Sequence, residues 1–161
     1  MPLPENRHVK TAKLAALAAL ALPATAMVAL AAGANPAFKL RHDNFEAMGR
    51  AMKGSVDELK KASPNPAVIR AHADRLAAAS VKVKGYFPKG TGPEAGVKTE
   101  ALPAIWQRPA DFAAAADRLV GATKGLQSVA ATGDIARIQP ALGAVGAACK
   151  NCHDSFRKPH S

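Results

Sequence analysis

Apolar residues recur at intervals of three and four along four segments of the chain, with polar residues between them. This spacing places the apolar side chains on one face of a helix, so it predicts four amphipathic helices. The first is expected from Asn35-Pro36 to Ala62, and Pro64 and Pro66 are expected to end it and start the second. Its apolar stripe is Phe45, Met48, Met52, Val56 and Leu59.

The second helix is expected from Pro66 to Lys84, with Gly85 ending it. A loop of 23 residues follows, from Tyr86 to Arg108, and loops of this length are usually functional or packed by their own side chains. The residues expected on the inner face of the second helix are Val68, Ile69, His72, Leu76, Ala79 and Val83. The apolar residues expected to anchor the loop are Tyr86, Phe87, Leu102, Ile105 and Trp106.

The third helix is expected to start near Pro109, and Asp134 is expected to cap the start of the fourth. The turn between them is short, so these two helices should be antiparallel neighbours. Pro140 is expected to kink the first turns of the fourth helix or leave them irregular. The stripe of the third helix is Phe112, Ala116, Leu119, Thr123, Leu126 and Ala130. The fourth helix has a heptad-like seam of Ile138, Leu142, Val145, Cys149, Cys152 and Phe156.

The N-terminal segment has the pattern of a secretory signal peptide. Basic residues in positions 1–13 precede an apolar stretch from Leu14 to Leu22 and small-residue cleavage sites such as Ala24-Thr25-Ala26. We therefore expect residues 1–32 to be removed, with cleavage between 26 and 37, leaving 35–161 as one domain exported to the periplasm. An uncleaved membrane anchor is the alternative, but Pro23 interrupts the apolar run and alanine makes it weakly hydrophobic.

The composition supports helices and argues against several partners. Alanine is abundant and aromatic residues make up 4% of the chain, which predicts a thin core that a large flat cofactor would fill. The formal net charge is +10, but the basic residues are scattered at helical spacing rather than gathered in a block with aromatics. We therefore expect no nucleic-acid binding and no stable membrane insertion of the mature chain, while the charge can steer an acidic redox partner.

Both cysteines of the chain lie in the run Cys149-Lys150-Asn151-Cys152-His153, which has the spacing of a c-type haem attachment motif. On a helix, positions 149, 152 and 153 fall within about 100° of arc. Two thiols can then bond to neighbouring vinyl groups of a haem, and the imidazole can reach the iron from the same side. The motif therefore predicts one covalently bound haem c, with the cysteines and His153 on the core side.

Four other interpretations of the motif agree less well with the chain. Zinc usually takes four ligands, and the chain has no second cysteine pair and no nearby histidine pair. A redox dithiol is expected at a helix N-terminus after a strand, whereas this motif lies near a helix C-terminus. A disulfide between positions i and i+3 of one helix would constrain almost nothing. A chance match is disfavoured by the export signal and by the core-facing seam.

The chain resembles the cytochrome c′ family in three blocks that follow one another in the family's order. They are Arg41-x-x-x-Phe45-x-x-x-Gly49-x-x-Met52-Lys53, the loop from Phe87 to Trp106, and the C-terminal motif through Arg157. The resemblance implies an antiparallel up-down-up-down four-helix bundle carrying one haem c. It implies thioethers at Cys149 and Cys152 and an axial iron ligand at His153.

The resemblance also implies roles for residues outside the motif. Arg41 would reach a haem propionate, Arg157 would lie beside the His153 face, and Phe45 would lie over the opposite, distal face of the iron. Phenylalanine has no lone pair to donate, so we expect five-coordinate, high-spin iron that admits small diatomic gases such as nitric oxide and carbon monoxide. Electron transfer to small redox proteins is also expected, as is a homodimer. Enzymatic catalysis is not, because no distal acid-base pair is evident.

Other side chains compete for the distal position. Met48 and Met52 share the stripe with Phe45 and are counted among the pocket residues, and a thioether can ligate haem iron, although methionine at this spacing is more often core. The alternative function is therefore a low-spin, six-coordinate Met-His electron carrier. His42 and His72 are weaker candidates for the same position.

Overall fold

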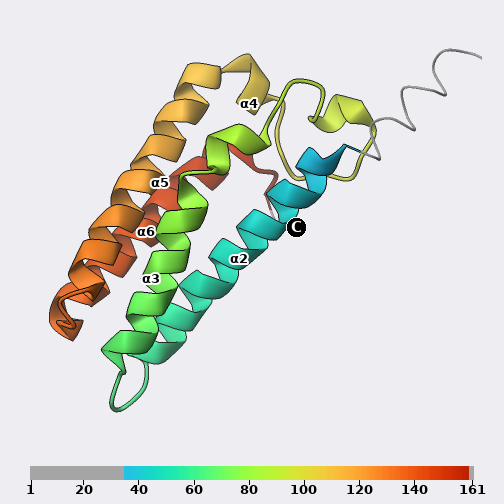
Figure 1. Cartoon of the computed structure of the whole chain (residues 1–161). Helices are drawn as coiled ribbons and strands as arrows, with labels where there is room; N and C mark the ends of the chain where they lie inside the picture. Colours follow the sequence, from blue (N-terminus) through green and yellow to red (C-terminus); the bar gives the residue numbers. More distant parts are fainter. Residues whose placement is uncertain (1–34, 160–161) are drawn as a thin grey trace, which may run out of the picture.

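The structure is a computed structural model that describes residues 35–159. Its four long helices are α2 (Pro36–Leu59), α3 (Pro66–Ser80), α5 (Pro109–Ala130) and α6 (Ile135–Phe156). They lie side by side, and the chain reverses direction from each to the next (Figure 1). The predicted all-α, up-down-up-down bundle is confirmed. The predicted signal peptide lies outside the residues that the structure describes.

Polar caps fix where three of these helices begin. The Asn35 side chain accepts a hydrogen bond from the backbone N–H of Ala37 at 3.0 Å, and Asn65 does the same for Ala67 at 2.9 Å. A proline follows each of these asparagines, where its missing N–H costs nothing. The expected cap at Asp134 is confirmed, since its carboxylate accepts from the N–H of Arg137 at 3.3 Å.

Two helices end earlier than their sequence patterns predicted. α2 ends at Leu59 rather than Ala62, because the carboxylate of Glu58 accepts the N–H of Asn65 at 2.9 Å and draws the turn back onto the helix. α3 ends at Ser80 rather than Lys84 and gives way to a 3₁₀ turn, η1 (Val83–Tyr86). The tighter turn directs Val83 into the core, where it is almost completely buried.

Pro140 does not leave the first turns of α6 irregular, which was one of the two expected effects. The helix runs without interruption from Ile135 to Phe156 with this proline inside it. Proline removes one backbone hydrogen bond, the one that the carbonyl of Ala136 would accept. Ala136 and Pro140 are both exposed, so water can satisfy that carbonyl and the helix continues.

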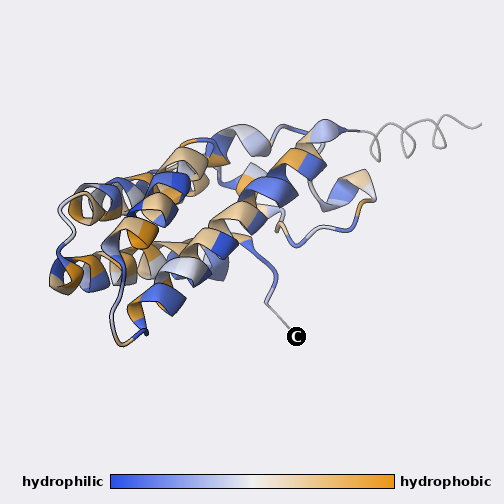
Figure 2. Ribbon diagram, turned by 60° about the horizontal axis from the view of Figure 1, so that its bottom comes forward, coloured by the Kyte–Doolittle hydropathy of each residue, from blue (hydrophilic) through white to orange (hydrophobic). Residues whose placement is uncertain are grey.

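The core follows the predicted stripes on α5 and α6 but departs from them on α2 and α3. On α2 only Met48 of the predicted stripe is buried, together with Ala51 and Ser55, whereas the other members of the stripe are half-buried. Each long helix carries hydrophobic and hydrophilic residues along its whole length, as Figure 2 shows. The expected stripe of α5 is buried throughout, and so is the apolar part of the α6 seam. Val68 was expected inside but is 37% exposed, whereas Ala73 is completely buried. The buried face of α3 is therefore centred on Ile69, Ala73 and Leu76 rather than on Val68.

The four helices do not pack equally against one another. α2 packs along α3, α3 along α5, and α5 along α6, whereas α2 and α6 meet over a much shorter stretch. The long loop closes one end of the bundle and contains η2 (Pro93–Ala95) and the short helix α4 (Ala104–Gln107). The expected anchoring by Trp106 is confirmed, since its indole N–H donates to the carbonyls of Phe87 and Pro88 at 3.2 and 3.0 Å.

The same loop is also tied to the end of α6. Ala101 forms an isolated antiparallel bridge with Arg157. The N–H of Leu102 donates to the Phe156 carbonyl at 3.0 Å, and the N–H of Lys158 donates to the Glu100 carbonyl at 2.8 Å. This pairing brings Glu100, which is far from the C-terminus in the sequence, next to the motif helix.

Candidate haem site

The candidate site lies on the faces of α2 and α6 that point toward each other. The methyl group of Met52 reaches α6 at Gly146, where a β-carbon would stand only 3.4 Å from Met52 Cε. Glycine therefore leaves the space that this methyl group fills. The contact fixes the register of the two helices at one point.

That register places Phe45 across from His153. Phe45 precedes Met52 by seven residues, and His153 follows Gly146 by seven. Seven residues are about two helical turns. Phe45 therefore lies on the same face of α2 as Met52, and His153 on the same face of α6 as Gly146, in each case about 10 Å along the helix axis. Because α2 and α6 run in opposite directions, both steps lead the same way along the bundle (Figure 1). Phe45 and His153 therefore lie at the same level on facing helices.

The two motif cysteines are half-buried on α6 and are not joined to each other. Burial raises the pKa of the Cys149 thiol above its ordinary value. Burial also raises the pKa of Cys152, as does the neighbouring Cys149, while Arg118 opposes the rise. Burial therefore disfavours the thiolate form that a redox dithiol requires. Both cysteines pack against the hydrophobic core, as the seam predicted.

His153 is exposed and follows directly after the half-buried Cys152. Each residue turns 100° around a helix, so His153 lies beside the seam, on the flank of α6 that faces α2. It borders a hollow of about 330 Å³. The residues that line this hollow are His153, Asp154, Arg157, Lys158 and Pro159.

Arg157, one turn beyond His153, is held by an acidic partner that the sequence pattern did not predict. Its Nη2 lies 2.5 Å from Oε2 of Glu100, and its Nε donates to the same oxygen at 2.7 Å. The bridge between Ala101 and Arg157 fixes both backbones beside each other. No sequence signal indicates this pair, because Glu100 and Arg157 meet only through the tertiary fold.

Arg41 is buried at 7% exposure, and burial lowers its pKa from the ordinary value. Its guanidinium donates to the Thr91 carbonyl at 3.1 and 3.2 Å and to the Thr99 hydroxyl at 3.3 Å. It also stacks over the rings of Phe38 and Phe87 at 5.0 and 4.8 Å. Within residues 35–159 no carboxylate pairs with it, so only neutral acceptors and aromatic rings offset the charge of this buried cation.

The structure separates the other distal candidates. Met48 is buried, and its sulfur accepts at 3.6 Å from Asn44, which also donates to the Ala79 carbonyl of α3; Phe45 and Met52 lie half-buried. His42 is exposed and faces Glu46 at 3.5 Å. His72 packs on Gly54 between α2 and α3, away from α6. Of these side chains, only Phe45 and Met52 share the face of α2 that contacts α6.

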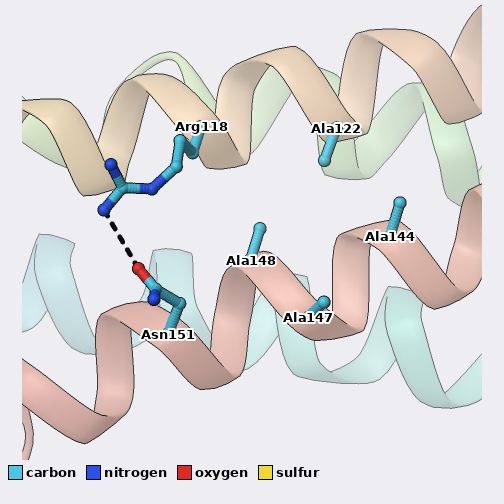
Figure 3. A pocket seen from close by; sticks show the side chains of 6 residues that line it. All are labelled: Arg118, Ala122, Ala144, Ala147, Ala148 and Asn151. Carbon is cyan, nitrogen blue, oxygen red and sulfur yellow. Dashed lines mark hydrogen bonds between the residues drawn. The ribbon is translucent and has the colours of Figure 1, made fainter.

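A second hollow of about 350 Å³ lies on the outer side of the motif, between α5 and α6 (Figure 3). Alanines form most of its wall. At one end Arg118 of α5 donates to the side chain of Asn151, inside the motif, at 3.0 Å. This contact ties the motif to α5, on the opposite flank from His153.

The residues present fit a covalently bound haem. The thiols of Cys149 and Cys152 would bind its vinyl groups, and the imidazole of His153, on the flank facing α2, would bind its iron. The buried guanidinium of Arg41, which has no acidic partner in the described residues, would hold a propionate. In the described part of the chain, no three His, Cys, Asp or Glu side chains converge, so zinc has no ligand set here. Fold and site together define a c-type haem protein built on a four-helix bundle.

Comparison with known proteins specifies the family. A family model described as Cytochrome C′ matches residues 36–157. Cytochrome c′ of Allochromatium vinosum is 36% identical over 155 residues, covering 94% of this chain and 98% of its own length. Cytochrome c-554 of Cereibacter sphaeroides is 34% identical over 145 residues, covering 87% and 94%. The chain belongs to the cytochrome c′ family, whose members carry covalently attached haem c with its iron.

Solved structures agree with this assignment. A cytochrome c′ with ligand-controlled dimer dissociation superposes with a TM-score of 0.70 at 32% identity, covering 76% of this chain and 95% of its own. The nitric oxide complex of a point mutant of cytochrome c prime from Alcaligenes xylosoxidans gives 0.69 at 29% identity, covering 76% and 94%. None of the helices described here is long and apolar enough to cross a bilayer.

Proposed function

We propose that this protein is a five-coordinate, high-spin cytochrome that binds nitric oxide and carbon monoxide and passes single electrons. The observation that carries the proposal is Phe45, which lies level with His153 on the facing helix and has no atom able to ligate iron. Phenylalanine there also fills the space a water ligand would take. The nitric oxide complex of the related Alcaligenes protein supports the choice of ligand.

The proposal gives each site residue a role. Cys149 and Cys152 form the thioethers and His153 is the axial ligand. Arg41 pairs with a propionate, which supplies the anion that its buried guanidinium otherwise lacks. Arg157 lies on the His153 side, where its cation disfavours the oxidised iron less than a lone guanidinium would, because the Glu100 carboxylate offsets its charge. The bound haem supplies the gas binding and the one-electron chemistry.

The rival proposal is a low-spin, six-coordinate carrier with methionine as second axial ligand. Met52 is the side chain to consider, because the sulfur of Met48 already accepts a hydrogen bond on the α3 side. Met52 packs on Gly146, about two turns from the level of His153, which favours the five-coordinate proposal.

The visible spectrum of the ferrous protein, with and without carbon monoxide, tests the two proposals. The protein should be produced with the c-type maturation machinery. We expect a high-spin ferrous spectrum that changes fully on adding carbon monoxide. A low-spin ferrous spectrum that carbon monoxide leaves unchanged would favour methionine ligation and refute the five-coordinate assignment.

The wider setting is part of the same proposal. We expect export to the periplasm after loss of residues 1–32, electron exchange with small redox proteins and no enzymatic reaction. A homodimer is also expected, through α2 and α3. The related protein with ligand-controlled dimer dissociation supports dimerisation, as do the exposed apolar side chains of Leu40, Val68 and Val81 on or next to these helices.

A further inference from the structure

We propose that Phe87, a residue of the long loop, controls how fast gas ligands reach the distal side of the haem by bracing the ring of Phe45. The inference rests on the proposed function, which places Phe45 over the iron. It adds a residue from outside the helix bundle to the distal site.

Phe87 contacts two residues that the proposed site uses. Its ring meets the ring of Phe45 edge-on, with centroids 6.1 Å apart and planes at 64°. The guanidinium of Arg41 lies over the same ring at 4.8 Å. Arg41 and Phe45 are four residues apart on α2 and therefore share one helix face. One loop side chain thus touches both the proposed propionate partner and the proposed distal residue.

The Phe87 ring is also packed against aromatic side chains other than Phe45. Its ring packs edge-on against Phe112 of α5 at 4.9 Å and against Trp106 at 6.0 Å. The indole N–H of Trp106 also donates to the Phe87 carbonyl at 3.2 Å. Phe112 is buried and meets Phe156 of α6 at 5.4 Å. Phe87 therefore transmits the rigidity of α5, α6 and the loop to the ring of Phe45.

The consequence concerns the step in which a ligand enters. A diatomic molecule approaching the distal side must displace the Phe45 ring, because that ring occupies the space. Displacement separates Phe45 from Phe87, so the strength of their contact contributes to the barrier. An aromatic pair of this geometry is worth about 1 kcal/mol, which corresponds to roughly a fivefold change in rate.

The test is the rate of carbon monoxide association with the ferrous holoprotein, measured by flash photolysis for single and double variants. We expect Phe87→Leu to accelerate association by roughly fivefold and Phe87→Tyr, which keeps the ring, to leave the rate unchanged. Phe38→Leu is the matched control. Phe38 is also half-buried and also lies under Arg41, at 5.0 Å, but in the described residues its ring has no contact with Phe45.

The double variant shows whether Phe87 acts through Phe45. Phe45→Ala should accelerate association, and adding Phe87→Leu should then change little. The thermal unfolding midpoints of the wild type, the two single variants and the double variant give a second readout. The double variant should lose less in midpoint temperature than the sum of the losses of Phe45→Ala and Phe87→Leu. Phe87→Met fills the volume without a ring and replaces the leucine variant if that variant does not fold.

The outcomes separate this inference from the proposed function. If Phe45→Ala leaves the rate unchanged, the distal placement of Phe45 is wrong and the inference is lost with it. If Phe45→Ala accelerates association but Phe87→Leu does not, only the bracing role is refuted. The bracing role is also refuted if Phe38→Leu matches the effect of Phe87→Leu, or if the effects of Phe45→Ala and Phe87→Leu on the rate multiply independently.

Discussion

The pair formed by Glu100 and Arg157 should contribute measurably to stability, although both side chains reach solvent. Two guanidinium nitrogens bind one carboxylate oxygen at 2.5 and 2.7 Å, with the side chains 34% and 56% exposed for Arg157 and Glu100. Exposed pairs usually contribute about 0.2–1 kcal/mol. Here the bridge at Ala101 already fixes both backbones, which reduces the entropy that pairing costs. We therefore expect a coupling energy near the upper end, about 1 kcal/mol.

A double-mutant cycle with Glu100→Gln and Arg157→Gln, followed by urea unfolding, measures this coupling. The exposed pair of Lys84 and Asp117, at 2.8 Å, is the matched control because no β-bridge aligns its backbones. We expect the control cycle to give a smaller coupling and both couplings to fall in 1 M salt, where the Debye length is about 3 Å. A Glu100–Arg157 coupling of zero, or one no larger than the control, would refute the argument that the bridge preorganises the pair.

Three further predictions address the distal site, acid stability and helix packing. Phe45→Met should shift the ferrous visible spectrum toward low spin, and an unchanged high-spin spectrum would contradict the placement of Phe45. The pKa of Glu58 lies below its ordinary value of 4.5, chiefly because Lys61 donates to the carboxylate, so its contribution to stability is present above pH 4.5 and declines as the pH falls below it. Urea titrations at several pH values should show that the free energy of unfolding of Glu58→Gln declines less below pH 4.5 than that of the wild type. Identical pH profiles for the two proteins would exclude this contribution of Glu58. Gly54→Ala should lower the free energy of unfolding by about 1–3 kcal/mol, because the new β-carbon would lie 2.5 Å from the His72 ring. Gly49→Ala, which faces open space on the same helix, should raise it by about 0.5–1 kcal/mol. Equal free energies of unfolding for the two variants would contradict this prediction.

The sequence alone was sufficient for the helices and for the haem motif, because both depend on local chemistry. Spacings of three and four identified the stripes, and the buried stripe of α5 matches its prediction throughout. Asp134 and the prolines after Asn35 and Asn65 gave correct helix starts, since a cap is satisfied within a few residues. The motif at Cys149 and Cys152 is equally local, because one helical turn determines which side chains share a face.

Helix ends and site neighbours were decided by tertiary contacts that no local pattern records. α2 stops at Leu59 because the Glu58 carboxylate binds the start of α3, and α2 meets α6 over only a short stretch. Glu100 reaches Arg157, and Phe87 reaches Phe45, only after the loop has folded over the end of the bundle. Local sequence determines which face of a helix is apolar, but the packing of helices and loop determines what that face meets.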